Sequence, residues 1–451
     1  MTTPVSPPLW GEQRNLIGVG FQRKRGYPMF SSDGDLNVEF VTGLKCVFCG
    51  AIYSTRIPYT CPACGITGIL DVQYNYPAIA RRMTRRSLAK RPEYSHWRYR
   101  ELLPIRKDAV LPSLQVGWTP VVETASLARH LGLKTLYLKD DGRNPTGSLK
   151  DRASAVGVAK AREKQQKIIA CASTGNAASS LAGMAASLGL RSVIFVPERA
   201  PEPKVTQLLI FGATVLRVRG SYEDAFQLCQ NSCERWGWYN RNSAINPYLV
   251  EGKKTAGLEI CEQLAWQVPD WVAVSVGDGC TIAGVWKGFY EMKALGLIES
   301  TPHMLGVQAA GAAPVTTAFR SGEALKPIEP HTIADSIAVG VPRNWKKAVL
   351  AVQASGGTMI NVQDEKILEA MRSAGRLTGI FAEPAAATAV AGVHRAVEDG
   401  IIKRTASVLA LITGNGLKDI RGAQSAVSKR FDIAPDGAGL EPILKERDLL
   451  G

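Results

Sequence analysis

Residues 135–163, TLYLKDDGRNPTGSLKDRASAVGVAKARE, contain a strand, a turn and a helix in immediate succession. The apolar run at the start is typical of a buried strand, and the segment from Asp151 onward has helical spacing. A Pro-Thr-Gly-Ser turn places Lys150 at the beginning of the helix. One interpretation is a surface lysine, although the helix macrodipole disfavours a cation in the first turn. The other is a catalytic lysine presented into a cleft, and the loops described below favour it.

The alternation of strand and helix continues along the rest of the chain. Further apolar runs occur at 167–173, 192–197, 213–220, 271–277 and 406–414, and helical patterns lie between them. This βαβ order predicts parallel sheets covered by helices on both faces. We therefore expect an α/β fold with two doubly wound lobes, in which ligands bind where strand ends meet helix starts.

The length and composition suit a protein of two or three domains, because the 451 residues are 45% apolar and 21% charged. Residues 1–105 have no sustained helical period and are expected to form an irregular N-terminal segment. We expect a large lobe from 106–150 together with 243–430, and a small α/β lobe from 151–242. Residues 431–451 are expected to form a C-terminal tail.

The formal net charge is +14, and a large share of it lies between Arg81 and Lys107. No recognisable nucleic-acid-reading helix carries it, so we expect no nucleic-acid partner; attraction of anionic substrates is a commoner consequence. The first 15 residues lack the order of a signal peptide. No stretch approaches the roughly 18 apolar residues that span a bilayer. The sequence therefore predicts a cytoplasmic protein with no membrane partner.

Four of the nine cysteines form the pattern C-x₂-C-x₁₁-C-x₂-C, at Cys46, Cys49, Cys61 and Cys64. Four thiolates at this spacing suit a tetrahedral Zn²⁺, so we expect a structural zinc ribbon within 46–64. The alternative is a ribbon-like relic that kept its cysteines without metal. Four thiolates leave no open position on the metal, which makes this site a scaffold in either case.

Two more strand-end loops have the residue types of an anion site. The first enters a helix and could grip a substrate carboxylate with free backbone N–H groups; it comprises Ser173, Thr174, Gly175 and Asn176. The second is a glycine-rich turn before a helix and could wrap a phosphate; it comprises Gly277, Asp278, Gly279, Cys280 and Thr281. Taken singly, the first loop is a weak signal because an ordinary N-cap also explains it, and the second is more often a tight turn than a phosphate site. With Lys150 and the loop that starts at Thr413, four strand-end loops converge on one cleft.

The motifs NPTGSLKDR, ASTGN, NPYLVEGKKT, IFAEPAAAT and TGNGLKD together resemble the threonine synthase family, among the fold-type II (tryptophan synthase β-like) enzymes that use pyridoxal 5′-phosphate (PLP). The resemblance extends from about Trp97 to Asp419. It implies that the large lobe binds PLP and that the protein is a homodimer. By the same resemblance, Lys150 is the Schiff-base lysine, Asn176 bonds the phenolic oxygen, the loop 277–281 holds the cofactor phosphate, and Thr413 faces the pyridine nitrogen.

The resemblance implies a PLP-dependent lyase acting on a small amino acid. A hydroxyl at Thr413 cannot hold the ring nitrogen protonated as a carboxylate would, which favours β/γ-elimination or replacement over transamination. The family reaction converts O-phosphohomoserine and water to threonine and phosphate, with Lys150 as acid and base. A catalytically silent ligand-binding module that kept the fold is the non-enzymatic alternative.

Two departures from the family pattern keep a second substrate class open. Ala177 and Ala178 stand where the family has hydroxyl residues, and Leu249 stands where it has an arginine, so we expect these three residues to line the substrate pocket. A site without these groups suits a less anionic substrate, such as that of a serine/threonine ammonia-lyase or of a replacement synthase of specialised metabolism. Lys253, Lys254 or Arg143 could supply a substitute cation.

Overall fold

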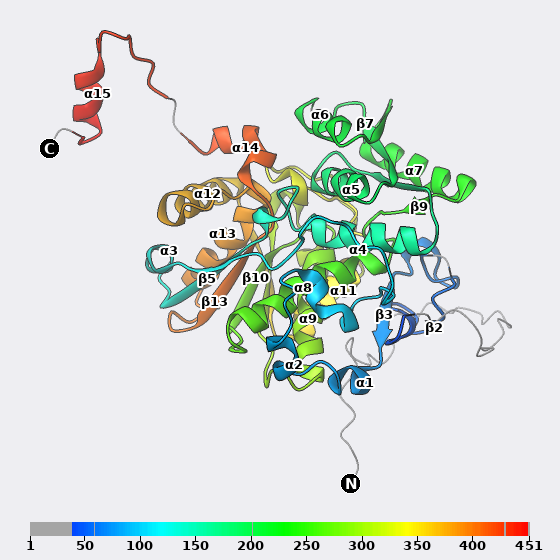
Figure 1. The fold of residues 1–451 in the computed structure, drawn as a ribbon. Coiled ribbons are helices and arrows are strands. Elements are labelled where there is room, and N and C mark those ends of the chain that lie inside the picture. The colour runs from blue at the N-terminus through cyan, green and yellow to red at the C-terminus, as the bar shows by residue number, and fades with distance from the viewer. Residues whose placement is uncertain (1–37, 58, 201, 428–429, 450–451) are drawn as a thin grey trace.

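The computed structural model describes residues 38–57, 59–200, 202–427 and 430–449. Two α/β sheets lie side by side, and a smaller N-terminal sheet packs beneath them (Figure 1). The strands and helices of 135–236 follow the predicted order, beginning with β5 (Thr135–Asp140) and α4 (Lys150–Glu163).

The larger sheet has six strands in the order β12-β11-β10-β13-β5-β4, and only the edge strand β4 runs antiparallel. Its strands, besides β5, are β4 (Val121–Glu123), β10 (Trp271–Ser275), β11 (His303–Ala309), β12 (Thr358–Val362) and β13 (Ser407–Ile412). The central strands are almost wholly apolar and buried, because helices cover both of their faces.

The smaller sheet is entirely parallel, in the order β8-β7-β6-β9. Its strands are β6 (Ile168–Ala172), β7 (Arg191–Pro197), β8 (Thr214–Val218) and β9 (Tyr239–Asn240), and its helices are α5 (Asn176–Ser187), α6 (Glu202–Ile210) and α7 (Tyr222–Trp236). These elements form a separate group at the upper right of Figure 1.

Glycines let the central helices α8 (Tyr248–Gln263) and α9 (Cys280–Ala294) approach closely. A Cβ at Gly257 would lie 2.4 Å from the carbonyl oxygen of Val285, and one at Gly252 would lie 2.0 Å from that of Arg152 in α4. The other helices are α3 (Ala125–His130), α10 (Pro314–Ser321), α11 (Trp345–Ala354), α12 (Asp364–Thr378), α13 (Pro384–Glu398), α14 (Ile420–Ser425) and the exposed α15 (Leu440–Glu446).

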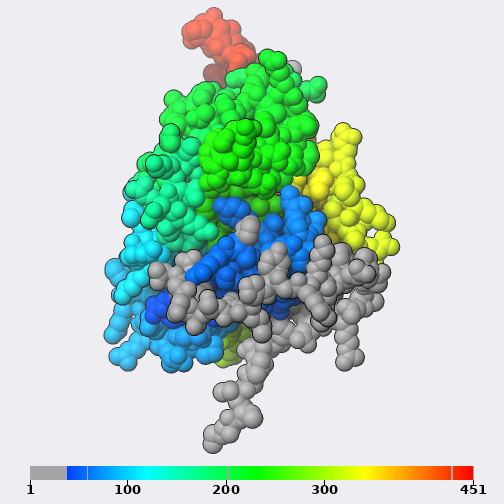
Figure 2. All heavy atoms as spheres, turned by 90° about the vertical axis from the view of Figure 1, so that its right-hand side faces the viewer, coloured from blue at the N-terminus to red at the C-terminus, as the bar shows by residue number. Residues whose placement is uncertain are grey.

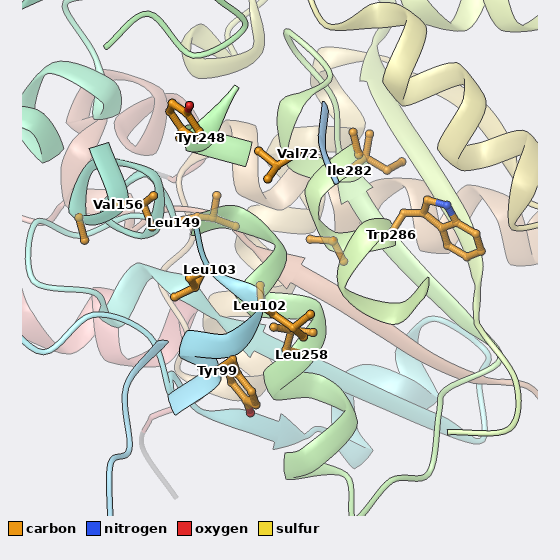
Figure 3. Packing of buried hydrophobic residues seen from close by; sticks show 14 of the residues in the cluster. Val72, Tyr99, Leu102, Leu103, Leu149, Val156, Tyr248, Leu258, Ile282 and Trp286 are labelled. Atoms are coloured by element: carbon orange, nitrogen blue, oxygen red, sulfur yellow. The ribbon is translucent and has the colours of Figure 1, made fainter. Parts of the chain in front are cut away.

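Residues 38–105, here called the N-terminal module, are more ordered than the sequence predicted. They form an antiparallel sheet of β1 (Val41–Cys46), β2 (Ile52–Tyr53) and β3 (Leu70–Tyr74), followed by α1 (Tyr76–Ala80) and α2 (Arg85–Ala89). These elements are too short to show a period in the sequence. Side chains from the module, such as Val72 and Leu102, belong to the same buried core as Leu258 of α8 and Trp286 of α9 (Figure 3).

A buried ion cluster joins the module to the large lobe. Asp71 of β3 pairs with Lys287 of α9 at 3.0 Å and with Lys347 of α11 at 2.9 Å, and all three side chains are at most 1% exposed. Lys287 also pairs with Glu251 of α8 at 2.8 Å. The module also lies against the small lobe (Figure 2). There Tyr59 accepts a hydrogen bond from the backbone N–H of Asn240.

Across the described residues, the helices are too short or too polar for any of them to traverse a lipid bilayer.

Candidate active site

A cavity of about 860 Å³ opens where the carboxyl ends of strands from both sheets meet. Lys150 and residues of the other three predicted strand-end loops all line this cavity: Ser173, Thr174, Gly175, Asn176, Gly277, Asp278, Gly279, Cys280, Thr281 and Thr413. Residues up to 263 positions apart in the chain thus meet at the edge of two parallel sheets. This is the place where doubly wound folds bind ligands.

Lys150 begins α4, as the turn before it predicted. The backbone N–H of Leu149 donates to the carbonyl oxygen of Thr413 at 2.9 Å, and Ser148 bridges to Gly414, so the lysine turn is tied to the end of β13. Burial lowers the pKa of Lys150 to about 8, and the charge of nearby Lys253 acts in the same direction. Because a larger share of the amine is neutral at pH 7 than for an ordinary lysine, the group is suited to nucleophilic and acid–base work.

The Ser173–Gly175 loop leads into α5, whose first residue is Asn176. The backbone N–H of Gly175 donates to Ser173 Oγ at 3.2 Å, and a Cβ placed at Gly175 would have no heavy atom within 4 Å. The loop therefore leaves open space in front of the unpaired N–H groups of the helix start, as an anion site requires.

Glu383 is a cavity residue to which the sequence analysis assigned no role. It is 2% exposed, and its carboxylate accepts bonds from Asn176 Nδ2 at 2.8 and 3.0 Å. Burial raises its pKa, although Asn176 and the charge of Lys150 oppose the shift. The motif IFAEPAAAT was noted as part of the resemblance. A carboxylate between apolar residues at the start of a helix was the signal that could have identified it.

The Gly277–Thr281 loop ends two residues earlier than predicted, at Gly279, since α9 begins at Cys280. Asp278, an acid beside an expected phosphate, is occupied elsewhere: Oδ1 accepts from the backbone N–H of Arg343 at 2.7 Å, and Oδ2 accepts from Cys280 Sγ at 3.3 Å. Burial raises the pKa of Cys280 to about 12, so this thiol is neutral at physiological pH. The loop therefore presents backbone N–H groups rather than a thiolate.

Replacing Gly279 by alanine is expected to weaken both the fold and PLP binding. Gly279 has φ +92°, and a Cβ there would lie 2.9 Å from Asn344 O and 3.0 Å from Ala348 Cβ. The control is Gly296→Ala, because Gly296 has φ +70° but open space around its Cβ position, so only the backbone strain of about 1–2 kcal/mol applies. Thermal unfolding and equilibrium dialysis with PLP compare the two; equal losses would contradict a steric requirement at the loop.

The three residues proposed from the sequence as a substitute cation in the substrate site lie in different environments. Lys253 is 1% exposed and lines the cavity, and burial lowers its pKa although the charge of Asp278 opposes the shift. Lys254 is buried in the ion cluster, bonded to Glu251 at 2.6 Å, and Arg143 is exposed outside the cavity lining.

The expectation that Ala178 and Leu249 line the pocket with Ala177 is wrong for the first two. Both are fully buried, because α5 and α8 turn those faces toward the core, and only Ala177 reaches the cavity. A Cβ on Gly157 of α4 would meet Leu249 Cδ2 at 2.8 Å and Arg241 Cγ at 4.0 Å, so Leu249 and Arg241 approach the same point on α4. Of these two, only Arg241 lines the cavity.

Arg241 is the second cavity residue that the sequence analysis missed. Its guanidinium is 1% exposed and donates to Ser154 Oγ at 2.9 and 3.2 Å and to Ser243 Oγ at 2.8 Å. Among the described residues no carboxylate forms an ion pair with Arg241 or with Lys253. Ser154 lies one helical turn beyond Lys150 on the same face of α4, so the guanidinium lies close to the lysine.

The four N-terminal cysteines come together as predicted. Their sulfur atoms all lie within 4.8 Å of one another, with Cys46 and Cys64 4.0 Å apart and Cys49 and Cys61 3.7 Å apart. Four sulfurs at about 2.3 Å from a tetrahedral zinc would be about 3.8 Å apart. The arrangement therefore fits a zinc ion.

Comparison with known proteins agrees with this geometry. The family model described as "Pyridoxal-phosphate dependent enzyme" matches residues 112–414. Threonine synthase of Methanocaldococcus jannaschii is 41% identical over 406 residues, which cover 89% of this chain and 99% of that protein. Threonine synthase of Methanosarcina acetivorans is 43% identical over 380 residues, covering 83% of this chain and 92% of that protein.

Solved structures show the same fold. The processed form of threonine deaminase isoform 2 from Solanum lycopersicum aligns with a TM-score of 0.60 at 23% identity, over 68% of this chain and 87% of that chain. Maize serine racemase aligns with a TM-score of 0.59 at 20% identity, over 73% and 93%. The predicted α/β fold of two lobes is thereby confirmed. The chain belongs to the pyridoxal-phosphate dependent enzymes and, within them, to the threonine synthase family, whose chemistry is elimination and replacement.

Proposed function

We propose that this enzyme converts O-phosphohomoserine and water to threonine and inorganic phosphate. The observation that carries the proposal is Arg241, a buried guanidinium that lines the cavity near Lys150 and whose hydrogen-bond partners among the described residues are hydroxyl groups. A buried charge without a counter-ion is costly, and a phosphate group on the substrate would supply that counter-ion. Arg241 thus supplies a guanidinium to the substrate site in place of the arginine that the family pattern has at the position of Leu249.

The cavity residues fit PLP. Lys150 would hold its aldehyde carbon, Asn176 its phenolic oxygen and Thr413 its ring nitrogen. The 277–281 loop at the start of the 15-residue helix α9 would hold its phosphate, with Lys253 as the balancing cation. When bound, PLP supplies an electron sink for the bond changes at the α-carbon of the amino acid.

The protein's own groups then divide the remaining work. The Ser173–Gly175 loop binds the substrate carboxylate, and Arg241 binds its phosphate. The Lys150 amine takes and returns protons at the α- and β-carbons, and Glu383 can hold a proton beside it. Over the whole reaction the phosphate leaves the γ-carbon, which gains a proton. The β-carbon loses a proton and gains the hydroxyl of water, and the other hydrogen of water goes to the released phosphate.

The alternative substrate class is not favoured by the comparisons, since the relatives at 37–43% identity are threonine synthases. The test is to incubate the holo-protein separately with O-phosphohomoserine, O-phosphoserine, serine, threonine and homoserine, and to identify the products. Threonine and phosphate from the first compound are expected. A keto acid from serine or threonine, without phosphate release from O-phosphohomoserine, would refute the proposal.

Replacing Arg241 by methionine is expected to raise KM for O-phosphohomoserine about 10-fold to 150-fold, because a charge-assisted hydrogen bond contributes about 1.5–3 kcal/mol. Binding of 2-aminopentanoate, which has no phosphate, should not change. Arg241→Lys keeps the charge and should recover part of the affinity. Steady-state kinetics and ligand titration of the holo-protein measure these effects. An unchanged KM in a folded variant would remove Arg241 from the substrate site.

Uptake of PLP by the apo-protein is expected to accelerate with pH and to level off above about 8, because the neutral Lys150 amine is the reactive form and its pKa is about 8. With an ordinary lysine, the rate of PLP uptake would reach half its maximum at a pH of about 10.4. Lys253→Met removes a neighbouring positive charge and should move the midpoint upward. Stopped-flow absorbance records the uptake; a midpoint near that of free lysine would contradict the shift.

The remaining assignments are part of the same proposal. A structural Zn²⁺ on the four cysteines is supported by the sulfur spacing, and elemental analysis finding no zinc in the purified protein would refute it.

We propose the domain division given above and a cytoplasmic location. We also propose a homodimer, and analytical ultracentrifugation can test this oligomeric state. We propose no nucleic-acid or membrane partner. Arg98 of the basic segment, for example, pairs with Glu262 at 2.7 Å rather than facing solvent; salt-dependent binding to duplex would argue against this.

A further inference from the structure

The N-terminal module contacts the large lobe close to the 277–281 loop. Phe48 lies between two of the clustered cysteines, Cys46 and Cys49, and its ring packs edge-on against Trp345, with centroids 6.1 Å apart and an interplanar angle of 69°. Trp345 is the first residue of α11. Two residues later, Lys347 donates to Leu70 O at 2.7 Å and to Asp71 at 2.9 Å, so the start of α11 is held by the module at two points.

The other side of the same helix start contacts the loop itself. The backbone N–H groups of Arg343 and Asn344 donate to Oδ1 and to the carbonyl oxygen of Asp278, at 2.7 and 3.1 Å. The carbonyl oxygen of Asn344 lies 2.9 Å from the position that a Cβ on Gly279 would occupy. The position of residues 343–345 therefore decides where Asp278 points and how the loop is shaped.

We propose that Phe48 and Trp345 are positioning residues that set the geometry of the cofactor phosphate site from the cysteine module. The proposal rests on the proposed role of the 277–281 loop in holding that phosphate, and it is independent of the amino-acid substrate. The module lies outside the cavity, since none of its described residues lines it. Its effect on the site is therefore transmitted by packing through α11, and it concerns PLP affinity rather than substrate binding.

The chain offers a matched control for Phe48. Ile66 lies two residues after Cys64 and is 48% exposed, close to the 41% of Phe48, but it packs against no residue of α11 in the described aromatic and core contacts. An aromatic pair contributes about 0.5–1.5 kcal/mol. Phe48→Ala and Trp345→Ala should thus each weaken PLP binding to the full-length protein about 2-fold to 10-fold, and Ile66→Ala should leave it unchanged.

A double-mutant cycle tests the path of the effect, with PLP affinity measured by equilibrium dialysis. The Phe48→Ala, Trp345→Ala double variant should bind PLP about as well as either single variant, because both remove one contact. At saturating PLP, KM for the amino acid should not change. Phe48→Leu, which keeps an apolar side chain, should recover part of the affinity and serves if Phe48→Ala fails to fold.

Three results would overturn the proposal: an equal loss with Ile66→Ala, losses that multiply in the double variant, or unchanged affinity with a folded Phe48→Ala protein. The Gly279→Ala variant distinguishes a failure of the positioning role from a failure of the assignment of the 277–281 loop as the phosphate site. If Gly279→Ala leaves PLP affinity intact, the loop does not hold the phosphate. If Gly279→Ala weakens binding and Phe48→Ala does not, only the positioning role is lost.

Discussion

Replacing Lys150 by alanine is expected to lower the rate of phosphate release by at least about 10⁴-fold, because one side chain both holds the cofactor and moves protons at the substrate. Among the described residues, Lys253 is the other lysine that lines the cavity. Lys253 lies beside the 277–281 loop, where we propose that its charge balances the cofactor phosphate. The loss should therefore appear in kcat as well as in the affinity for PLP.

Mass spectrometry after borohydride reduction measures the covalent half of this prediction. A pyridoxyl adduct is expected on the peptide containing Lys150 in the wild-type protein and absent from the variant. Lys293→Ala, at an exposed position in the last turn of α9, is the control and should keep both the adduct and the activity. An adduct on another lysine, or full turnover by the Lys150→Ala protein, would refute the assignment.

Replacing Asp71 by alanine is expected to destabilise the protein by about 3–5 kcal/mol, because it leaves two buried ammonium groups without their shared carboxylate. Lys287 would keep Glu251 and the carbonyl oxygen of Val72, but Lys347 would keep only the carbonyl oxygen of Leu70. Unfolding in urea, followed by circular dichroism, measures the loss. The cluster lies between the N-terminal module and the large lobe. Unfolding of the Asp71→Ala protein in two separate transitions would therefore show that the cluster couples the unfolding of these two parts.

The pH dependence of this loss has a definite sign. Burial opposes ionisation of Asp71, but Lys287 and Lys347 together hold its pKa well below the usual range. A depressed folded-state pKa gives stability that is present above the unfolded value of about 3.9 and is lost as pH falls below it. The penalty of Asp71→Ala should thus be full at pH 7 and shrink under acid. Glu323→Ala, which breaks an exposed pair with Lys326, should cost little at any pH; an equal cost would contradict the role of burial.

Much of the active site could be predicted because its parts are local. Lys150, the Ser173–Asn176 loop and the Gly277–Thr281 loop each follow a strand and begin a helix, and such strand-turn-helix units are legible over some 10–20 residues. Because parallel strands run in the same direction, their carboxyl ends then lie together at one edge of the sheet. The cysteine spacing was equally informative, since two short loops suffice to bring four sulfurs together.

The residues that were missed depend on contacts between distant segments. Asn176 and Glu383 are 207 positions apart, and their hydrogen bond exists only because the tertiary fold brings the first residue of α5 to the residue before α13. Arg241 and Leu249 could not be distinguished as pocket or core from their own neighbours in the chain. The strand and helix patterns of the N-terminal module were too short to be recognised.

By itself, the sequence determined the fold class, the position of Lys150, the strand-end loops that line the cavity and the four clustered cysteines, because each is encoded in a short run whose geometry local backbone preferences decide. Only the tertiary structure decided which cation faces the cavity, which carboxylate lies beside the lysine, and that Phe48 reaches the helix next to the 277–281 loop. These depend on the direction a side chain takes when helices pack, and packing is settled by the whole core rather than by neighbouring residues.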